Sequence, residues 1–424
     1  MIPVAGSAYT FTYTTVGEIM AWIIGWDLIL EMLMAGSVIS KYWGVYLNDF
    51  MRLMGWNANT NLTFGSFHID IAPIIIVAFF TTLLVFGTKI GARVDGAMTV
   101  LKIAIVFFVV IVGFFYVKAS NFTPFIPPSQ PASTVEGSSA VTGVMTQPLW
   151  QFATGMTPSV YGVPGILSGA ALVFFAFIGF DVVATASEET KNPHKNVPLG
   201  IGVGMLLIIV MYMLVAVVTT GMVSYADLAK QDSPSLATAF ELVGADWAAK
   251  IISFGIVLGL ATVVMVLLLG LTRIVFAMSR DGLLPRGLSK TGKHGTPAAL
   301  QIVVGAVVAL VAAFFDIGVL SDMVNIGTLS AFTLVAISIP IMRKKRPDLP
   351  RAFKMPGSPW IPILIAVANF WLMLNLSVLT WIRFVVWLVV GFAIYFGYGY
   401  WHARLGKGDL TETLSAETDK AVNG

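Results

Sequence analysis

The chain has 424 residues, of which 57% are hydrophobic and only 11% are charged, with a formal net charge of +3 and a mean hydropathy of +0.86. A soluble globular domain carries about 25% charged residues, so this composition excludes a water-soluble protein of the usual kind and indicates lipid as the main solvent. The small net charge gives no sign of a nucleic-acid partner. The lack of cysteine excludes disulfides, thiolate catalysis and cysteine-based metal sites.

Ten segments are long and apolar enough to predict membrane-spanning helices, which need about 20 mostly apolar residues each. They are residues 17–40, 70–88, 96–117, 165–187, 197–223, 249–272, 297–315, 322–342, 359–379 and 382–402. Residues 121–131 carry four prolines, and 133–165 are rich in Gly, Ser, Thr and Pro, so we expect loops there. Residues 226–247 favour a short surface helix, and the polar tail 403–424 is expected to be disordered.

The basic residues indicate the orientation. If the ten helices alternate, eighteen of the 25 Lys and Arg residues lie on one side and six on the other, with Lys102 inside a helix. The positive-inside rule places the richer side, and with it both ends of the chain, in the cytoplasm. The sequence opens at a helix entry without the pattern of a signal peptide, and an even number of helices upstream would fit this orientation.

Lys102 is an ionisable residue at membrane depth, about 10 Å inside its helix at a rise of 1.5 Å per residue. Such residues cost roughly 2.5–3.5 kcal/mol on insertion scales and are functional hypotheses by default. A buried lysine that cycles between charged and neutral forms is a candidate proton carrier. The alternative is a structural lysine whose ammonium group reaches back to the cytoplasmic interface. The sequence by itself favours neither interpretation.

Asp27 and Glu31 are four residues apart and therefore share one helix face. Asp27 lies about ten residues inside, near the midplane of the membrane. The functional hypothesis is a proton or cation site. The alternative is a buried pair that holds neighbouring helices together, and for Glu31, which nears the outer face, we favour this structural role.

Residues 174–180 read Phe-Phe-Ala-Phe-Ile-Gly-Phe and are followed by Asp181. Interrupted helices of transporters bind their substrate at unwound backbone near the midplane, and a glycine inside an apolar run is a marker of such a break. Gly179 by itself is a weak signal, since a lipid-facing aromatic stripe tolerates one glycine.

The four histidines fall in loops or at a helix end, and none lies four residues from another. A metal centre, a cofactor site or an intramembrane enzyme with a histidine base is therefore not expected. A Gly-rich phosphate loop of the Walker type is also missing, which argues against ATP-driven transport by this chain alone.

Several stretches together resemble the amino acid permeases of the amino acid–polyamine–organocation (APC) superfamily, most closely its cationic amino acid transporter-like branch. They are Pro3–Thr10, Gly17-Glu18, Gly25–Glu31, Phe174–Asp181, Glu188–Pro193, Pro198, Arg273, Met278–Pro285 and Asn325–Leu329. The resemblance runs from residue 1 to about 402. It implies an all-α fold of the LeuT type, in which helices one to five and six to ten form an inverted repeat, followed by two more.

On this resemblance the ten helices are numbers three to twelve of twelve, and the first two helices of the family lie outside the sequence. Residues 1–402 form one permease domain, with 17–117 as the remainder of the first repeat, 165–342 as the second repeat and 359–402 as the two additional helices. Because half of the family's carboxylate site belongs to the first helix, a chain that starts at Met1 is expected not to transport.

The resemblance also implies the site. In the proton-coupled members of the family a lysine on the fifth helix occupies the place of a sodium ion, and Lys102 matches it, with Thr262 as its neighbour. The broken sixth helix would bind an amino acid, with Phe175 as a gate and carbonyl groups of Ala176 and Ile178 on the ammonium group. The substrate-binding set is Phe175, Ala176, Phe177, Ile178, Gly179 and Phe180, and the candidate charge partners inside the membrane are Asp27, Glu31 and Asp181.

The resulting prediction is a monomeric, proton-coupled amino-acid symporter of the cell membrane that needs no cofactor or metal and works by alternating access. Three rivals stay open: a non-transporting fragment, a carrier of polyamines or other amines on the same scaffold, and a carrier of thiol compounds. The aromatic and small pocket residues fit neutral side chains at least as well as cationic ones.

Overall fold

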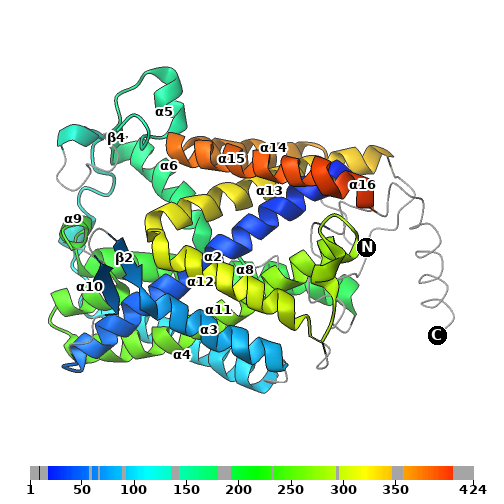
Figure 1. The fold of residues 1–424 in the computed structure, drawn as a ribbon. Coiled ribbons are helices and arrows are strands. Elements are labelled where there is room, and N and C mark those ends of the chain that lie inside the picture. Colours follow the sequence, from blue (N-terminus) through cyan, green and yellow to red (C-terminus); the bar gives the residue numbers. More distant parts are fainter. Residues whose placement is uncertain are drawn as a thin grey trace.

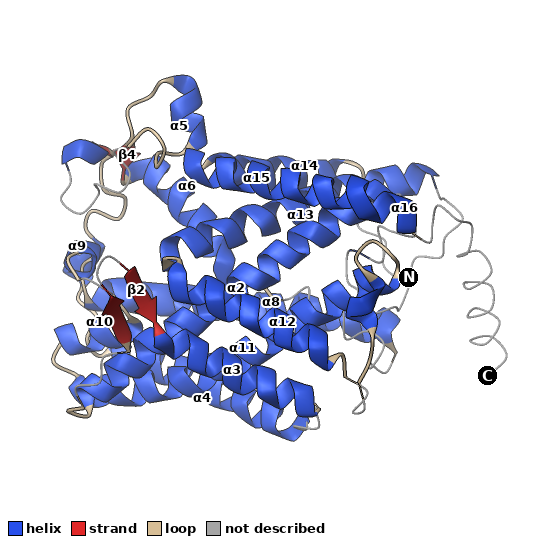
Figure 2. Cartoon of the chain, in the orientation of Figure 1, coloured by secondary structure: helices blue, strands red, loops and turns tan. Residues whose placement is uncertain are grey.

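The computed structural model describes residue 9 and residues 18–56, 60–64, 67–87, 92–134, 143–179, 192–231, 234–292, 296–345 and 357–403. Figure 1 shows a bundle of long helices, and Figure 2 shows that the strands are confined to one end of it. The predicted all-α fold class is confirmed in this described part of the chain. The predictions for Phe180 and Asp181 lie outside the described residues.

Each of the ten predicted segments overlaps a helix, and residues 180–187 of the fourth lie outside the described part of the chain. These helices are α2 (Glu18–Leu53), α3 (Ile71–Phe86), α4 (Ala92–Phe114), α6 (Gly162–Val173), α8 (Pro193–Met222), α11 (Asp246–Arg280), α12 (Ala298–Phe314), α13 (Ile317–Lys345), α14 (Trp360–Leu374) and α15 (Val378–Ile394). Among the described residues, six helices are long and apolar enough to cross a membrane, and α3, α6 with its extension, α12 and α14 are shorter apolar helices.

Short elements connect them. The short α-helices are α5 (Leu149–Thr154), α9 (Tyr225–Ala229), α10 (Leu236–Leu242) and α16 (Tyr400–His402). The 3₁₀ turns are η1 (Ala119–Phe122), η2 (Ala132–Thr134), η4 (Phe174–Phe177) and η6 (Arg286–Ser289), and η7 (Tyr395–Gly399) is a π-helix. Antiparallel pairs are formed by β1 (Asn61–Phe64) with β2 (Phe67–Asp70) and by β3 (Gln130–Pro131) with β4 (Ser159–Val160). In Figures 1 and 2, β2, β4, α5, α9 and α10 lie at the end of the bundle away from the C-terminus.

Helix α2 runs through the centre of the bundle, with α13, α14 and α15 on one side and α3 and α4 on the other (Figure 1). It is the most buried of the six long apolar helices, and its side chains Trp22, Leu28 and Met32 pack with Ile274 and Met278 of α11 in the largest core cluster. By contrast, α4 and α8 bury little of their surface within the chain. A helix that is apolar all round and poorly buried suits a lipid-facing position.

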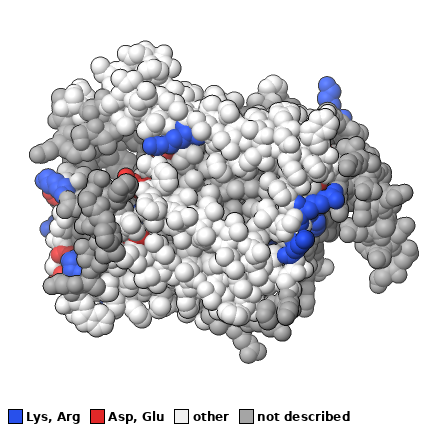
Figure 3. Space-filling view, in the orientation of Figure 1, with Lys and Arg blue, Asp and Glu red and all other residues white. Residues whose placement is uncertain are grey.

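The charged side chains are arranged as a membrane requires. On the face shown in Figure 3 most of them gather at the two ends of the molecule, and a broad uncharged band lies between. A bilayer interior of about 30 Å disfavours charge, so this band is the surface that meets the acyl chains.

The structure corrects several predicted boundaries. Helix α2 continues to Leu53, thirteen residues past the predicted end, and its last turns make polar contacts with α10. At 36 residues it is about 54 Å long, well above the thickness of the hydrocarbon layer. Helix α15 begins at Val378, before the predicted 382, since the Ser377 hydroxyl accepts from the Thr380 amide and caps it. The predicted loop 133–165 contains α5 and the start of α6.

Candidate functional site

The helix that carries the aromatic run ends before Gly179, the last residue that the structure describes in this segment. Helix α6 ends at Val173 and tightens into the 3₁₀ turn η4, after which Ile178 is extended, with φ −68° and ψ 142°. Gly179 has a φ of +112°, a region that side chains with a Cβ rarely enter, so glycine is needed to leave the helix at this point. The chain therefore exposes unwound backbone in the middle of an apolar segment.

Two side chains from other helices hold this break in place. The Asn325 amide of α13 donates to the carbonyl of Leu172 at 3.0 Å, and the Tyr212 hydroxyl of α8 donates to the carbonyl of Ala176 at 2.7 Å. Carbonyl groups at the end of a helix lack partners within it, so they need such donors when they are away from water. Asn325 belongs to a motif that the sequence singled out, whereas Tyr212 was missed.

The side chains of the break divide between the protein core and the outside. Phe175 and Ile178 are half-buried against the largest core cluster. The ring of Phe177 lies edge-on to Tyr212, with the ring centres 5.2 Å apart. Ala176 is exposed, and so are Leu172 and Val173, by 49% and 55%. The described part of the break is thus lined by aromatic and aliphatic groups, with backbone carbonyls as its polar atoms.

Lys102 lies against the buried middle of α11. A methyl group at position 259 would be 3.3 Å from Lys102 Cγ and 3.7 Å from Cε, so the stem of the lysine crosses the bare backbone of Gly259. Thr262 follows one turn later, and its hydroxyl donates to the carbonyl of Gly259 at 2.9 Å. The stem of Lys102 and the hydroxyl of Thr262 therefore both contact Gly259 on α11, and their direct contact stays a prediction.

Asp27 and Glu31 are completely buried on α2. The Ser330 hydroxyl of α13 donates to Asp27 Oδ2 at 2.8 Å, while Oδ1 of the same carboxyl has no hydrogen-bond partner among the described residues. A buried carboxyl that joins two packed helices contributes to their association. This geometry favours a structural role for Asp27 at the contact between α2 and α13.

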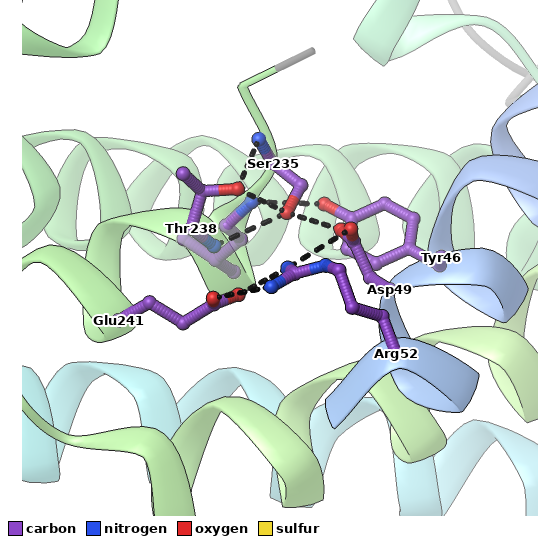
Figure 4. Close-up of polar contacts among 7 residues, drawn as sticks. Tyr46, Asp49, Arg52, Ser235, Thr238 and Glu241 are labelled. Atoms are coloured by element: carbon purple, nitrogen blue, oxygen red, sulfur yellow. Dashed lines mark hydrogen bonds and ion pairs between the residues drawn. The ribbon is translucent and has the colours of Figure 1, made fainter. Parts of the chain in front are cut away.

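A second polar cluster joins the end of α2 to the surface helix α10 (Figure 4). Arg52 binds both carboxylate oxygens of Glu241, at 2.9 and 2.8 Å. The Ser235 hydroxyl donates to Asp49 at 2.8 Å, and the Leu236 amide donates to the Tyr46 hydroxyl at 3.1 Å. Because Ser235 also caps α10, the same residues start this helix and attach it to α2.

This cluster carries a stability prediction. Glu241→Lys replaces a two-pronged ion pair by a repulsion, and since Arg52 is 54% exposed we expect a loss of about 1 kcal/mol. The double variant Arg52→Glu with Glu241→Arg should regain most of that loss. Thermal unfolding in detergent measures both. Equal losses in the single and double variants would show that the pair contributes nothing.

Near the same end, Lys41 connects α2 to its neighbours. Its ammonium group donates to the carbonyl of Ala312 at 3.0 Å and lies 3.7 Å from the carboxylate of Asp70. Burial raises the pKa of Asp70, although Lys41 opposes that effect. The contact fastens the start of α3 and the end of α12 to α2.

The comparisons with known proteins decide the family. The sequence model described as amino acid permease matches residues 1–399. The chain belongs to the amino acid permease family. It is 42% identical to the branched-chain amino acid permease BcaP of Bacillus subtilis over 96% of this chain and 82% of that protein.

Two other relatives show the breadth of the family. The methylthioribose transporter of Bacillus subtilis is 37% identical over 96% of this chain and 82% of its own length. Cationic amino acid transporter 3 of Arabidopsis thaliana is 35% identical over 80% of this chain and 52% of its own. The protein is therefore a multi-pass membrane transporter of the APC type, with amino acids as the family's substrates, and it is not an enzyme.

Proposed function

We propose that this permease is a proton-coupled amino-acid symporter of the cell membrane and that Lys102 carries the coupling proton. The observation behind this proposal is the position of Lys102, whose stem packs on Gly259 one turn from Thr262. From residue 96 to Phe114, Lys102 is the sole ionisable residue of α4. An ionisable residue inside an apolar helix is costly and often functional, and reversible protonation is a role that a lysine can fill there.

The proposed transport cycle needs no covalent chemistry. An amino acid binds with its ammonium group on the carbonyls of the break in α6, and Lys102 changes its protonation as the protein passes from one open side to the other. The positive-inside rule favours a cytoplasmic position for both ends of the chain, and in that orientation the Arg52–Glu241 cluster would face the outside. The proposed working unit is a monomer.

We propose an amino acid with an apolar side chain as the substrate. The described break offers aromatic and aliphatic groups, with Phe175 and Ile178 beside it. The name of the relative at 42% identity also specifies branched-chain amino acids. A pocket of this kind discriminates weakly between aliphatic chains but rejects a charged group that it cannot pair.

The test is uptake of radiolabelled leucine into proteoliposomes under an imposed proton gradient. If the chain transports, against the expectation for a start at Met1, the proposal predicts leucine accumulation that collapses with a protonophore. Isoleucine and valine should compete strongly with leucine, and arginine, putrescine and methylthioribose weakly. Competition by arginine or putrescine at equal concentration would contradict the proposed substrate. Uptake that ignores the proton gradient would contradict symport. Failure of this exact chain to bind or move any substrate would favour the non-transporting fragment.

Tyr212→Phe tests the break itself. The variant keeps the ring against Phe177 and removes the hydroxyl that holds the carbonyl of Ala176. A hydrogen bond of this kind contributes about 1 kcal/mol, which corresponds to about a fivefold rise in KM with little change in the maximal rate. Leucine uptake at a range of concentrations measures both. An unchanged KM would mean that the Tyr212 hydroxyl does not contribute to substrate binding. The control is Tyr225→Phe, which removes a tyrosine hydroxyl from the short helix α9.

A further inference from the structure

Two buried glycines lie one turn apart on the face of α11 that meets α4. They are Gly255 and Gly259. A methyl group at 259 would lie 3.3 Å from Cγ of Lys102, and one at 255 would collide with the side chain of Ile105. Small residues at such contacts let two helices approach closely in a membrane. Each glycine therefore receives one side chain of α4, an apolar one at 255 and the lysine at 259.

The pairing fixes the direction in which Lys102 points. Since Ile105 meets Gly255 and Lys102 meets Gly259, the two helices are antiparallel. Side chains on a helix tilt toward its N-terminus, so the stem of Lys102 leads from residue 102 toward residue 98. On α11 that direction leads from Gly259 toward Thr262.

The hydroxyl oxygen of Thr262 can accept a hydrogen bond from a cation. Its hydroxyl proton is already donated to the carbonyl of Gly259, at 2.9 Å. The lone pairs of the same oxygen stay available as acceptors, and a lysine ammonium group is a donor only. An ammonium group that continues along the slot over Gly259 would therefore approach an oxygen that can accept a hydrogen bond.

We propose that Gly259 is a positioning residue for proton coupling: its missing side chain forms a slot that directs the Lys102 ammonium group to the hydroxyl oxygen of Thr262. This inference rests on the proposed role of Lys102. The ionisable groups along the packed helices are few. Between Lys250 and Arg273, α11 carries none, and α8 carries Tyr212 beyond its first turn.

The test measures the reactivity of Lys102 in the purified chain in detergent. Gly259→Val fills the slot and pushes the stem away from Thr262. We expect the rate of acylation of Lys102 by a succinimidyl ester to rise at least fivefold, measured by mass spectrometry against the exposed Lys250 on the same helix. Thr262→Val should raise that rate as well, because it removes the acceptor but leaves the slot open.

Gly255→Val is the matched control, since it crowds the same helix contact at Ile105 and leaves the lysine slot open. We expect less than a twofold change in Lys102 labelling there. Gly259→Ala is the variant to use if the valine prevents folding, and it should shift labelling in the same direction. Equal labelling changes at 255 and 259, or unchanged labelling in Gly259→Ala or in Thr262→Val, would overturn the proposal.

Uptake distinguishes a failure of this inference from a failure of the proposed function. Gly259→Ala should shift the pH profile of gradient-driven leucine uptake, while Gly255→Ala should keep the wild-type profile. If Lys102→Ala retains its proton dependence, the proposed function fails. If Lys102→Ala loses it and the two glycine variants behave alike, the role of Gly259 alone is wrong.

Discussion

Lys102→Ala is expected to abolish accumulation of leucine driven by a proton gradient. One pH unit corresponds to about 1.4 kcal/mol, so one-to-one coupling across a gradient of one unit supports about a tenfold accumulation. Without the group that binds the proton this ratio should fall to about one. Uptake into proteoliposomes with a set internal and external pH measures it, with exchange of internal for external leucine as a second assay.

The control is Lys118→Ala, which removes the same charge just past the end of α4, where the side chain is exposed. That variant should accumulate leucine like the wild type. Lys102→Ala should stay folded, with a modest loss of stability, because the shorter side chain makes no clash and empties only the slot over Gly259. Concentrative uptake that keeps its pH dependence in Lys102→Ala would assign the coupling to another residue.

The approximate positions of the helices could be predicted from the sequence. Long apolar runs predicted ten segments, and each contains a helix, since the bilayer demands this length and this composition. For the break the sequence offered Gly179 as a weak signal only, and it was the structure that added its positive φ of +112°. Both features depend on residues close together in the chain.

What the sequence lacked is information on which helix faces touch. Tyr212 stands in an apolar run of α8, and no periodic pattern marks its face, so its bond to Ala176 could not be foreseen. The slot at Gly259 likewise exists only when α4 lies beside α11. The end of α2 was placed too early because Tyr46, Asp49 and Arg52 read as loop residues until α10 supplies their partners.

The attachment of α15 to α2 depends on such contacts as well. The indoles of Trp26 and Trp387 stack with their centres 4.4 Å apart, and each donates to the backbone carbonyl of the other, at 2.9 and 3.3 Å. Trp22 also stacks with Trp26, with the ring centres 5.6 Å apart. Gly391 lets the ring of Trp26 approach the backbone of α15. Trp26 is therefore the centre of the contact between the two helices.

Trp26→Ala is expected to destabilise the protein by about 3–5 kcal/mol, the usual cost of removing a large buried aromatic side chain. Two stacked contacts and one indole hydrogen bond are lost together, and the backbone carbonyl of Trp387 loses its donor. Thermal unfolding in detergent measures the effect. Trp401→Ala is the control, because that indole is 67% exposed and its removal should change stability little. Similar unfolding temperatures for the two variants would mean that lipid or detergent replaces the packing of Trp26, and that the Trp26–Trp387 contact does not hold α15 to α2.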